Sequence, residues 1–526
     1  MIFVSKIKQF FKSTTYPALL LALSVIGTIF FYSGRLNWIF IELTLGKEGI
    51  LHALVPVLAL NSVLLCVLTL LRKHKIKGDE KWYSLLLIPT SFLAFFVVIF
   101  ALVYTIIAFT GEAKYATLLY LKDSLLVAAL LILIPFSVLF LPSFKDKSRR
   151  TITAVILAVT LLIGIFNIFP VVPYKITSAP SVIDNGNEYS VVFSTNKYGT
   201  GYVEYSYNGK DYKLYDEMGG RLNTDSKIHS ISVPYEHLRN NTYSVGSTEV
   251  FEQYSYGSHR GKTVNSEKYT LKYNDSENQS FLVISDWHTE LDDAYKAVSY
   301  VGEYDSVILL GDSSPGVDFE EEVVKNIIEF AGEVAKGTKP IIYARGNHET
   351  RGQYAGKILD SLGLNEFYYT TNIGPYSFII LDSGEDKEDS HPEYGGMNNY
   401  GQYRADMIEW MKTVSLENEK VIAISHSWTL CDVEKELSTA GWNELDRVGT
   451  RLLLSGHYHD CRLLGSTNAE DELSMLSAHP NITGYIDGGK INGGFVASKM
   501  TLSPDGFILE AYNNNGEKVF NQNFEW

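Results

Sequence analysis

The chain has 526 residues, which is too long for one hydrophobic core, so several domains are expected. Residues 1–173 carry 16 Lys and Arg against 7 Asp and Glu, whereas the remainder carries 29 against 53. So acidic a body lacks the basic surface of a general nucleic-acid binder, and three cysteines are too few for a disulfide scaffold.

The first third contains five apolar stretches long enough to cross a bilayer as helices, for which about 20 residues are needed. They span residues 16–33, 50–71, 82–109, 118–141 and 151–172. The first stretch lacks the small-residue cleavage site of a signal peptide. We therefore expect residues 1–173 to form a membrane domain of five transmembrane helices.

The Lys and Arg residues around these stretches predict their orientation. The N-terminal segment and the second and fourth connections carry twelve basic residues, against four in the first and third. This bias puts the N terminus in the cytoplasm, and five crossings then put the acidic body outside the cell membrane. The stretches contain His52, Lys122 and Asp123 as their ionisable residues, all near stretch ends, which disfavours a transporter.

Residues 176–275 consist of short alternating runs that are rich in Tyr and are separated by Gly, Asn and Asp. This pattern predicts an antiparallel β-sandwich. The runs GYVEY and LRNNTYSV resemble the fibronectin-III-like domain that precedes the catalytic domain in relatives of purple acid phosphatases. We favour a structural spacer over a binding module for this segment, because sandwiches support many roles.

Residues 280–526 alternate strand-like runs with helical stretches, which favours an α/β domain. Five of the apolar runs are followed by polar motifs: Asp286-Trp287-His288, Gly311-Asp312, Gly346-Asn347-His348-Glu349, His426, and Gly456-His457-Tyr458-His459. Ligands bind beyond the carboxyl ends of the strands in open α/β sheets. One shared site is therefore expected at these strand ends.

In this order the motifs DWH, GD, GNHE, a lone His and GHYH resemble the calcineurin-like metallophosphoesterase superfamily over residues 281–500. The resemblance implies an αββα two-sheet domain that hydrolyses phosphate esters. It assigns one metal ion to Asp286, His288 and His459. It assigns a second ion to Asn347, His426 and His457, and it makes Asp312 the bridge between the two.

The ligand set of nitrogen and oxygen atoms without thiolates fits Mn, Fe, Zn or Co ions, in divalent or mixed-valence form. Such a pair of ions makes hydroxide available near neutral pH for attack on phosphorus. The resemblance makes His348 the proton donor to the leaving oxygen. Arg351 is either a bidentate partner of a phosphate oxygen or a surface arginine. Glu349 is expected to stabilise the turn rather than to bind metal.

The chain departs from the family pattern at Pro315, where many relatives carry an Asp that supports the catalytic His and purple acid phosphatases carry a metal-binding Tyr. We therefore expect no tyrosinate colour, and we expect support for His348 from elsewhere, with Asp318 as a candidate. The motif around His426 lacks the proline often found two residues later. The acidic insert 382–403 is either a substrate lid or a solvated loop.

These features predict a membrane-anchored phosphoesterase that acts outside the cell membrane on a phosphorylated small molecule or a lipid-linked substrate. The alternatives are a catalytically weak membrane sensor or scaffold, and a phosphodiesterase or nuclease that uses the same site. The complete ligand set disfavours the scaffold, and the acidic body disfavours nucleic acid. The five helices are compatible with a membrane-protein partner. Cys431 and Cys461 either form a disulfide or are free thiols.

Overall fold

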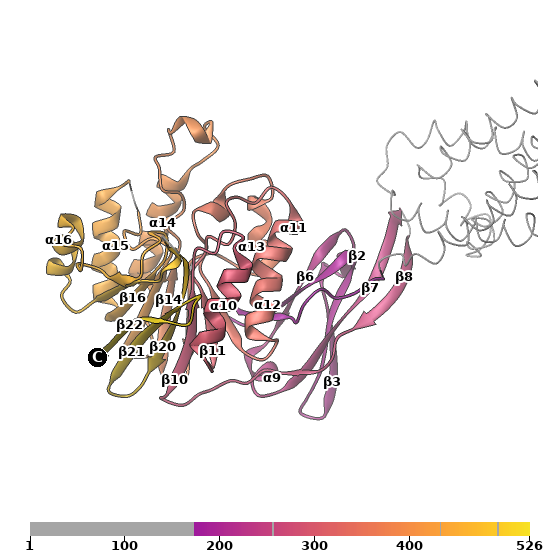
Figure 1. Cartoon of the computed structure of the whole chain (residues 1–526). Helices are drawn as coiled ribbons and strands as arrows, with labels where there is room; N and C mark the ends of the chain where they lie inside the picture. Colours follow the sequence, from indigo (N-terminus) through magenta and orange to yellow (C-terminus); the bar gives the residue numbers. More distant parts are fainter. Residues whose placement is uncertain (1–172, 255–256, 432, 492–493) are drawn as a thin grey trace, which may run out of the picture. The chain divides into compact units, whose positions relative to one another are not determined.

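The computed structural model describes residues 173–254, 257–431, 433–491 and 494–526 (Figure 1). The five predicted transmembrane helices lie outside the described residues. Within the described part of the chain, every helix is too short or too polar to cross a membrane. Residues Tyr174–Val250 and Gly261–Trp526 form one compact unit.

Fourteen of the described strands form one sheet. Its main path runs in the order β22 (Lys518–Glu525), β21 (Gly506–Asn513), β20 (Gly494–Leu502), β10 (Gln279–Ile284), β11 (Ser306–Leu309), β12 (Pro340–Tyr343), β1 (Ser181–Asp184), β2 (Tyr189–Tyr207), β7 (Thr242–Tyr254) and β8 (Gly257–Asn265). Four strands pair beside this path, namely β3 (Lys210–Tyr215), β6 (Ser226–Val233), β9 (Tyr269–Thr270) and β19 (Gly489–Ile491). A small separate ladder joins β4 (Glu217–Met218) and β5 (Arg221–Leu222).

Six further described strands form a second sheet. Their order is β13 (Tyr369–Ile373), β14 (Tyr376–Leu381), β15 (Lys420–Ser425), β16 (Thr450–Ser455), β18 (Thr483–Ile486) and β17 (Arg462–Leu463). The strands from β14 to β18 on this path are parallel, as are β10, β11 and β12 in the first sheet. Parallel strands end at one edge, so each sheet brings several loops together.

The helices lie between these strands in the sequence. They are α9 (Tyr235–Leu238), α10 (Leu291–Val301), α11 (Glu320–Val323), the π-helix η3 (Val324–Glu329), α12 (Phe330–Ala335), α13 (Ile358–Leu362), α14 (Tyr400–Thr413), α15 (Lys435–Arg447) and α16 (Glu470–Ala478). Short 3₁₀ turns are η4 (His348–Thr350), η5 (Ala355–Lys357) and η6 (Pro392–Tyr394). In α10, Ala294, Ala297 and Val301 are buried and recur at helical spacing, so that one face packs on the sheet.

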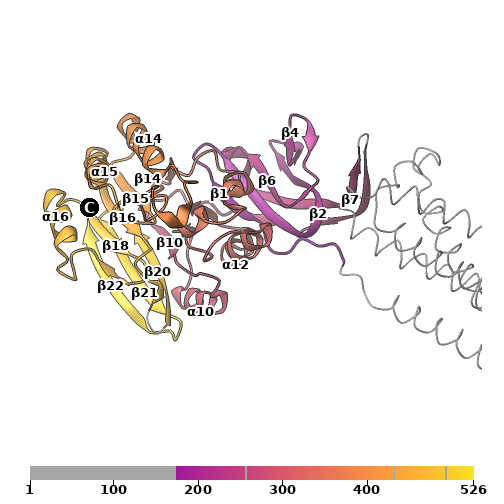
Figure 2. The ribbon, with the colours of Figure 1, turned by 90° about the horizontal axis from the view of Figure 1, so that it is seen from above.

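The alternation of side chains along the strands creates the layers. On β14, Phe378 and Ile380 belong to the core shared with the first sheet, whereas Ile379 and Leu381 pack in the core that contains residues of α14 and α15. Figure 2 shows α10 and α12 on one side of the paired sheets and α14 and α15 on the other. The predicted α/β domain with two sheets between helical layers is therefore confirmed.

The region before this domain is rich in strands, as predicted, but a separate fibronectin-III-like sandwich is not confirmed. Strand β1 pairs in parallel with β12 and antiparallel with β2, so the sheet continues across the predicted domain boundary. The four residues of β1 are all buried, which requires a neighbour on each side. The 19-residue strand β2 then pairs with β1 and β6 through its first half and with β7 and β3 through its second.

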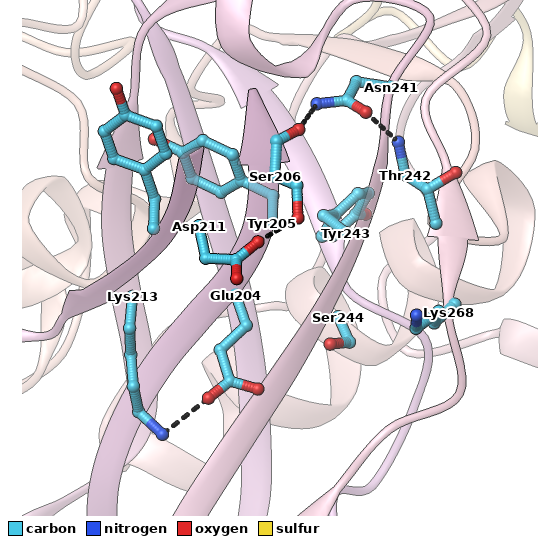
Figure 3. A pocket seen from close by; sticks show the side chains of 11 residues that line it. Glu204, Tyr205, Ser206, Asp211, Lys213, Asn241, Thr242, Tyr243, Ser244 and Lys268 are labelled. Carbon is cyan, nitrogen blue, oxygen red and sulfur yellow. Dashed lines mark hydrogen bonds and ion pairs between the residues drawn. The ribbon is translucent and has the colours of Figure 1, made fainter. Parts of the chain in front are cut away.

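The outer face of β3, β2 and β7 carries polar side chains around an open pocket of about 500 Å³ (Figure 3). The side chains that line it pair with one another across the strands. Lys213 Nζ lies 2.6 Å from Glu204 Oε1, and the Ser206 hydroxyl donates to Asp211 over 2.5 Å. Such cross-strand pairs are typical of a solvated sheet face and agree with a spacer role.

Candidate metal centre

The loops that follow five parallel strands meet at one edge of the two sheets. Asp286 and His288 follow β10, and Asp312 follows β11. The GNHE turn follows β12, whereas the remaining ligand candidates follow β15 and β16 in the second sheet. The structure brings all seven predicted ligands together at this edge, and their assignment to individual metal ions stays a prediction.

Two groups of side chains are arranged as the sequence predicted. Potential ligand atoms of Asp286, His288 and His459 lie within 4.8 Å of one another, as do those of Asp312, His426 and His457. In the first group, Asp286 Oδ1 lies 3.8 Å from His288 Nε2 and 3.7 Å from His459 Nε2. These spacings suit a shared cation, since ligand atoms about 2.1 Å from a tetrahedral ion lie roughly 3.4 Å apart.

Asp312 lies between the two groups. Its Oδ2 is 3.1 Å from His426 Nε2 and 3.7 Å from His288 Nε2. Asn347 completes the second group, because its Oδ1 lies 3.0 Å from His457 Nδ1. One carboxylate that faces both groups matches the bridging position that the resemblance assigned to Asp312.

Five of the seven ligand candidates have left-handed backbone conformations. The φ angles are 51° at Asp286, 38° at His288, 56° at Asp312, 71° at His457 and 51° at His459. This conformation is uncommon for residues with a side chain and costs about 1–3 kcal/mol each. Strain of this kind concentrates at functional sites, where the surrounding fold maintains it.

The close packing of backbones at this edge requires glycine at two turns. A Cβ atom on Gly346 would lie 2.2 Å from Asp312 Oδ1, and one on Gly456 would lie 2.6 Å from Asp286 Oδ2. Both distances are shorter than van der Waals contact. The glycines of the GNHE and GHYH motifs therefore let the ligand carboxylates approach the neighbouring strands.

The residues present fit bound metal ions. Asp286 Oδ1 is buried and, among the described residues, has no hydrogen-bond donor, although its Oδ2 accepts the His457 backbone N–H over 2.8 Å. A buried oxygen without a partner costs free energy, and a bound cation would remove that cost. The Nδ1 atoms of His426 and His459 donate to the carbonyls of Leu310 and Lys490 over 2.6 and 2.7 Å, which leaves Nε2 of each ring to face the cluster.

Neighbouring charges shift the pKa values of the side chains in the cluster. Burial alone would raise the pKa of Asp312, but the imidazoles of His426 and His348 outweigh burial and hold the pKa of this carboxyl well below its usual range. Burial lowers the pKa of His288 against the opposing effect of Asp312 and Asp286. Burial would lower the pKa of His426, but Asp312 and Asp286 outweigh burial and raise it to about 10, so a metal ion would displace a proton from this ring.

His348, the predicted proton donor, lies against this cluster with its Nε2 3.8 Å from Asp312 Oδ2. Its Nδ1 donates to the Pro315 carbonyl over 2.9 Å. The expectation that Asp318 supports His348 is wrong, because Asp318 Oδ1 accepts the Gln353 backbone N–H instead, over 3.3 Å. A backbone carbonyl replaces the carboxylate that many relatives use, which residue identity could not reveal.

Glu349 has the predicted structural role. The side chain is fully buried and accepts the backbone N–H groups of Asp312, Ser313 and Gly346 over 2.9, 2.5 and 2.9 Å. It thus ties the GNHE turn to the loop that carries Asp312.

Arg351, the other predicted catalytic residue, lies beside His348. Glu385 binds its guanidinium through two hydrogen bonds of 2.7 and 2.8 Å. Cys431 and Cys461 are free thiols.

Trp287 is a supporting residue that the sequence did not single out. It lies between two ligand candidates, is fully buried and stacks on Phe330 at 4.7 Å. Its indole N–H donates over 2.8 Å to the carbonyl of Asn326 inside the π-helix η3. A π-turn shifts the usual helical hydrogen bonds and is common near functional sites. The motif DWH contained the residue but gave no sign of this distant partner.

Replacing Trp287 by Phe is expected to lower the free energy of unfolding by about 1–3 kcal/mol, because the Asn326 carbonyl loses its buried donor. It is also expected to weaken metal binding, since the flanking Asp286 and His288 lose their anchor. Thermal unfolding with and without Mn²⁺ measures both effects. Trp442→Phe is the matched control, because this buried indole also donates to a backbone carbonyl, over 3.0 Å. Equal Mn²⁺ stabilisation in both variants would contradict an anchoring role for Trp287.

Asp487 follows β18 and gives the metal-free protein a pH-dependent stability. Burial raises the pKa of this carboxyl to about 8, although it accepts hydrogen bonds from Ser285 and Ser498. The folded state therefore keeps a proton that the unfolded chain releases near pH 4. Stability is expected to fall as the pH rises from 4 to 8, by up to about 1.4 kcal/mol per unit. Asp487→Asn is expected to reduce this slope in urea unfolding with chelator present. An unchanged slope would contradict the assignment.

The two-sheet α/β fold with an Asp and His cluster at the strand ends defines the class of metal-dependent phosphoesterases. Residues 280–461 match the family described as calcineurin-like phosphoesterase. This part of the chain is therefore a calcineurin-like metallophosphoesterase domain, and the chain is a metal-dependent phosphoesterase.

Solved structures with some likeness include PhoD, with 11% identity and a TM-score of 0.40 over 65% of this chain and 91% of the other. GAP50, the anchor in the inner membrane complex of Plasmodium, has 11% identity and a TM-score of 0.35 over 48% and 89%. A metallophosphoesterase from Sphaerobacter thermophilus has 14% identity and a TM-score of 0.22 over 47% and 89%. None of the curated proteins matches the sequence.

Proposed function

We propose that this protein is a membrane-anchored phosphoesterase that uses two metal ions outside the cell membrane to hydrolyse phosphate esters or phosphoanhydrides. The observation that carries the proposal is the convergence of seven strand-end ligand candidates, with Asp312 between the other six and five of the seven in strained backbone conformations. Loss of any one ligand would be expected in a relative that serves only as a scaffold. The complete cluster therefore favours an active enzyme.

Each residue of the cluster has a role in this proposal. Asp286, His288 and His459 would hold one ion, and Asn347, His426 and His457 would hold the other, with Asp312 shared by both. Metal ions held there would supply positive charge for the phosphoryl oxygens and would make hydroxide available near neutral pH. Hydrogen bonds from Nδ1 of His426 and His459 to backbone carbonyls fix the orientation of both rings.

His348 would give a proton to the leaving oxygen. The Nδ1 proton of His348 is hydrogen-bonded to the Pro315 carbonyl. The proton that His348 transfers must therefore be on Nε2, the atom that faces the cluster. A proton donor matters most for a basic alkoxide leaving group and least for an acidic aryl oxide. The proposal thus predicts a dependence on the leaving group that the metal ligands themselves would not produce.

The proposed location rests on the sequence. Five apolar stretches and the bias of Lys and Arg among their connections support a multi-pass anchor with the catalytic domain outside the membrane. A phosphorylated small molecule or a lipid-linked phosphate is the proposed substrate. Sealed membrane vesicles of known orientation test the location with a substrate that cannot cross the bilayer. Turnover by cytoplasmic-side-out vesicles alone would contradict it.

The proposed activity is tested with the full chain purified in detergent. With Mn²⁺ we expect hydrolysis of p-nitrophenyl phosphate, with chelator abolishing it. Faster hydrolysis of the bis(p-nitrophenyl) ester would identify a phosphodiesterase. No turnover of either ester with Mn, Fe, Zn or Co ions would contradict an enzymatic function and favour the scaffold.

A further inference from the structure

The insert after β14 holds Arg351, the neighbour of the predicted proton donor, through two carboxylates, of which Asp386 is the more distant, with Oδ1 3.4 Å from Nη2. Glu385, whose side chain is 1% exposed, holds Arg351 by two parallel hydrogen bonds, from Nε to Oε1 over 2.7 Å and from Nη2 to Oε2 over 2.8 Å. This bidentate arrangement fixes the plane of the guanidinium as well as its position. A phosphate group would have to displace a buried carboxylate to use the same two donors.

The remaining terminal nitrogen of Arg351 lies against His348. Arg351 Nη1 is 3.1 Å from His348 Nε2 and 3.3 Å from His348 Nδ1. Nearly equal distances to the two nitrogens place Nη1 beside the ring as a whole rather than along the lone pair of one atom. Together with the Pro315 carbonyl at Nδ1, this contact holds the ring from two sides.

Glu385 is itself held by a buried arginine. Arg404 on α14 is fully buried, and its Nη1 donates to the carbonyls of Ser383 and Glu385 over 3.2 and 3.1 Å. Its Nε donates to Glu434 over 2.7 Å. The backbone of the insert is therefore fixed to α14 at the residue that holds Arg351. A carboxylate placed in this way is prepared before substrate binds.

We propose that Glu385 is a positioning residue that holds the Arg351 guanidinium against His348 and thereby fixes the ring of the proton donor. The inference rests on the proposed function of His348. It also gives Arg351 a role different from the one that its sequence suggested. Arg351 acts on the departure of the leaving group through His348, and not on the binding of the phosphate.

The test compares an alkyl phosphate with p-nitrophenyl phosphate in the full chain loaded with Mn²⁺. Glu385→Gln retains the size of the side chain but weakens the ion pair. We expect kcat for the alkyl ester to fall about 10-fold or more, because orientation of a proton donor contributes part of a 10²–10⁴-fold effect. We expect a much smaller fall for the aryl ester and an unchanged KM for both.

Two further variants complete the experiment. Arg351→Lys retains the charge but removes the planar fork, and it is expected to give the same split between the two esters. Glu393→Gln is the control, because Glu393 lies on the same insert with a 67% exposed side chain that pairs with Lys387. It is expected to leave both esters unaffected.

The outcomes separate this inference from the proposed function. Wild-type protein that hydrolyses neither ester contradicts the proposed function. With active wild type, a raised KM and unchanged kcat in Arg351→Lys would identify a phosphate clamp and overturn the inference. An equal fall of kcat for both esters in Glu385→Gln would show a structural role, and no change in either variant would show no role. Metal content is measured in each variant, and its loss would also overturn the inference.

Discussion

Replacing Asp312 by Asn is expected to abolish metal binding and phosphoesterase activity together. The carboxylate lies between the two ligand groups, with Oδ2 3.1 Å from His426 Nε2 and 3.7 Å from His288 Nε2. An amide removes the negative charge that both ions would share. Activity is expected to fall by well over 100-fold, more than the loss of an outer partner of a metal ligand costs. Metal content by elemental analysis and turnover of p-nitrophenyl phosphate measure the two effects.

Asp318→Asn is the matched control for this variant. Asp318 lies on the same loop, is exposed, and accepts one backbone N–H. Its replacement is expected to leave metal content unchanged and to alter activity by less than about twofold. An Asp312→Asn protein that retained both metal ions and full activity would show that this carboxylate does not bridge them.

Replacing His348 by Ala is expected to leave metal binding intact and to slow the hydrolysis of alkyl phosphates by about 10²–10⁴-fold. The ring is not one of the seven predicted ligands, although its potential ligand atom lies within 4.8 Å of those of His288 and Asp312. An aryl oxide leaves without a proton, so hydrolysis of p-nitrophenyl phosphate is expected to be affected far less. Steady-state turnover of both esters and metal content give the comparison.

His391→Ala provides the corresponding control, because this imidazole lies on the insert and is 38% exposed. It is expected to behave as wild type on both esters. An equal loss on both esters in His348→Ala, or a loss of metal, would instead assign His348 a ligand or structural role. The two large predictions thus separate the ligands from the proton donor.

The sequence predicted the two-sheet domain and the residues that meet at its edge. It could do so because each ligand candidate directly follows an apolar strand, as Asp312 follows β11, and parallel strands end together. Glycine at position 346 next to Asn347 marked a tight turn for a physical reason, since no larger residue fits beside Asp312. These signals are local, so they are visible without the fold.

The supporting contacts could not be predicted, because they depend on partners distant in the sequence. The Pro315 carbonyl accepts a hydrogen bond from the His348 ring, 33 residues later in the sequence. The Trp287 indole donates to the carbonyl of Asn326 in the π-helix, 39 residues later. Backbone carbonyls are present at every position, so residue identity does not indicate which one accepts. The four-residue strand β1 likewise gave no sign that it pairs with β12 rather than within a separate sandwich.

Arg351 shows the same limit for charged side chains. The sequence placed it close to His348, and a phosphate partner was a reasonable expectation for an arginine in that position. Glu385, which the structure pairs with it, lies 34 residues further along in the acidic insert. Several carboxylates of that insert could have been the partner, and Asp386 Oδ1 does lie 3.4 Å from Arg351 Nη2. Glu385, whose backbone carbonyl accepts from Arg404, makes the two shorter hydrogen bonds.

The most direct test of the account is anomalous X-ray diffraction from crystals of the full chain grown with Mn²⁺. Two peaks are expected, roughly 3.5–4 Å apart, one on each side of Asp312. The first is expected beside Asp286, His288 and His459, and the second beside Asn347, His426 and His457. A map without a peak within coordination distance of Asp312 would contradict it.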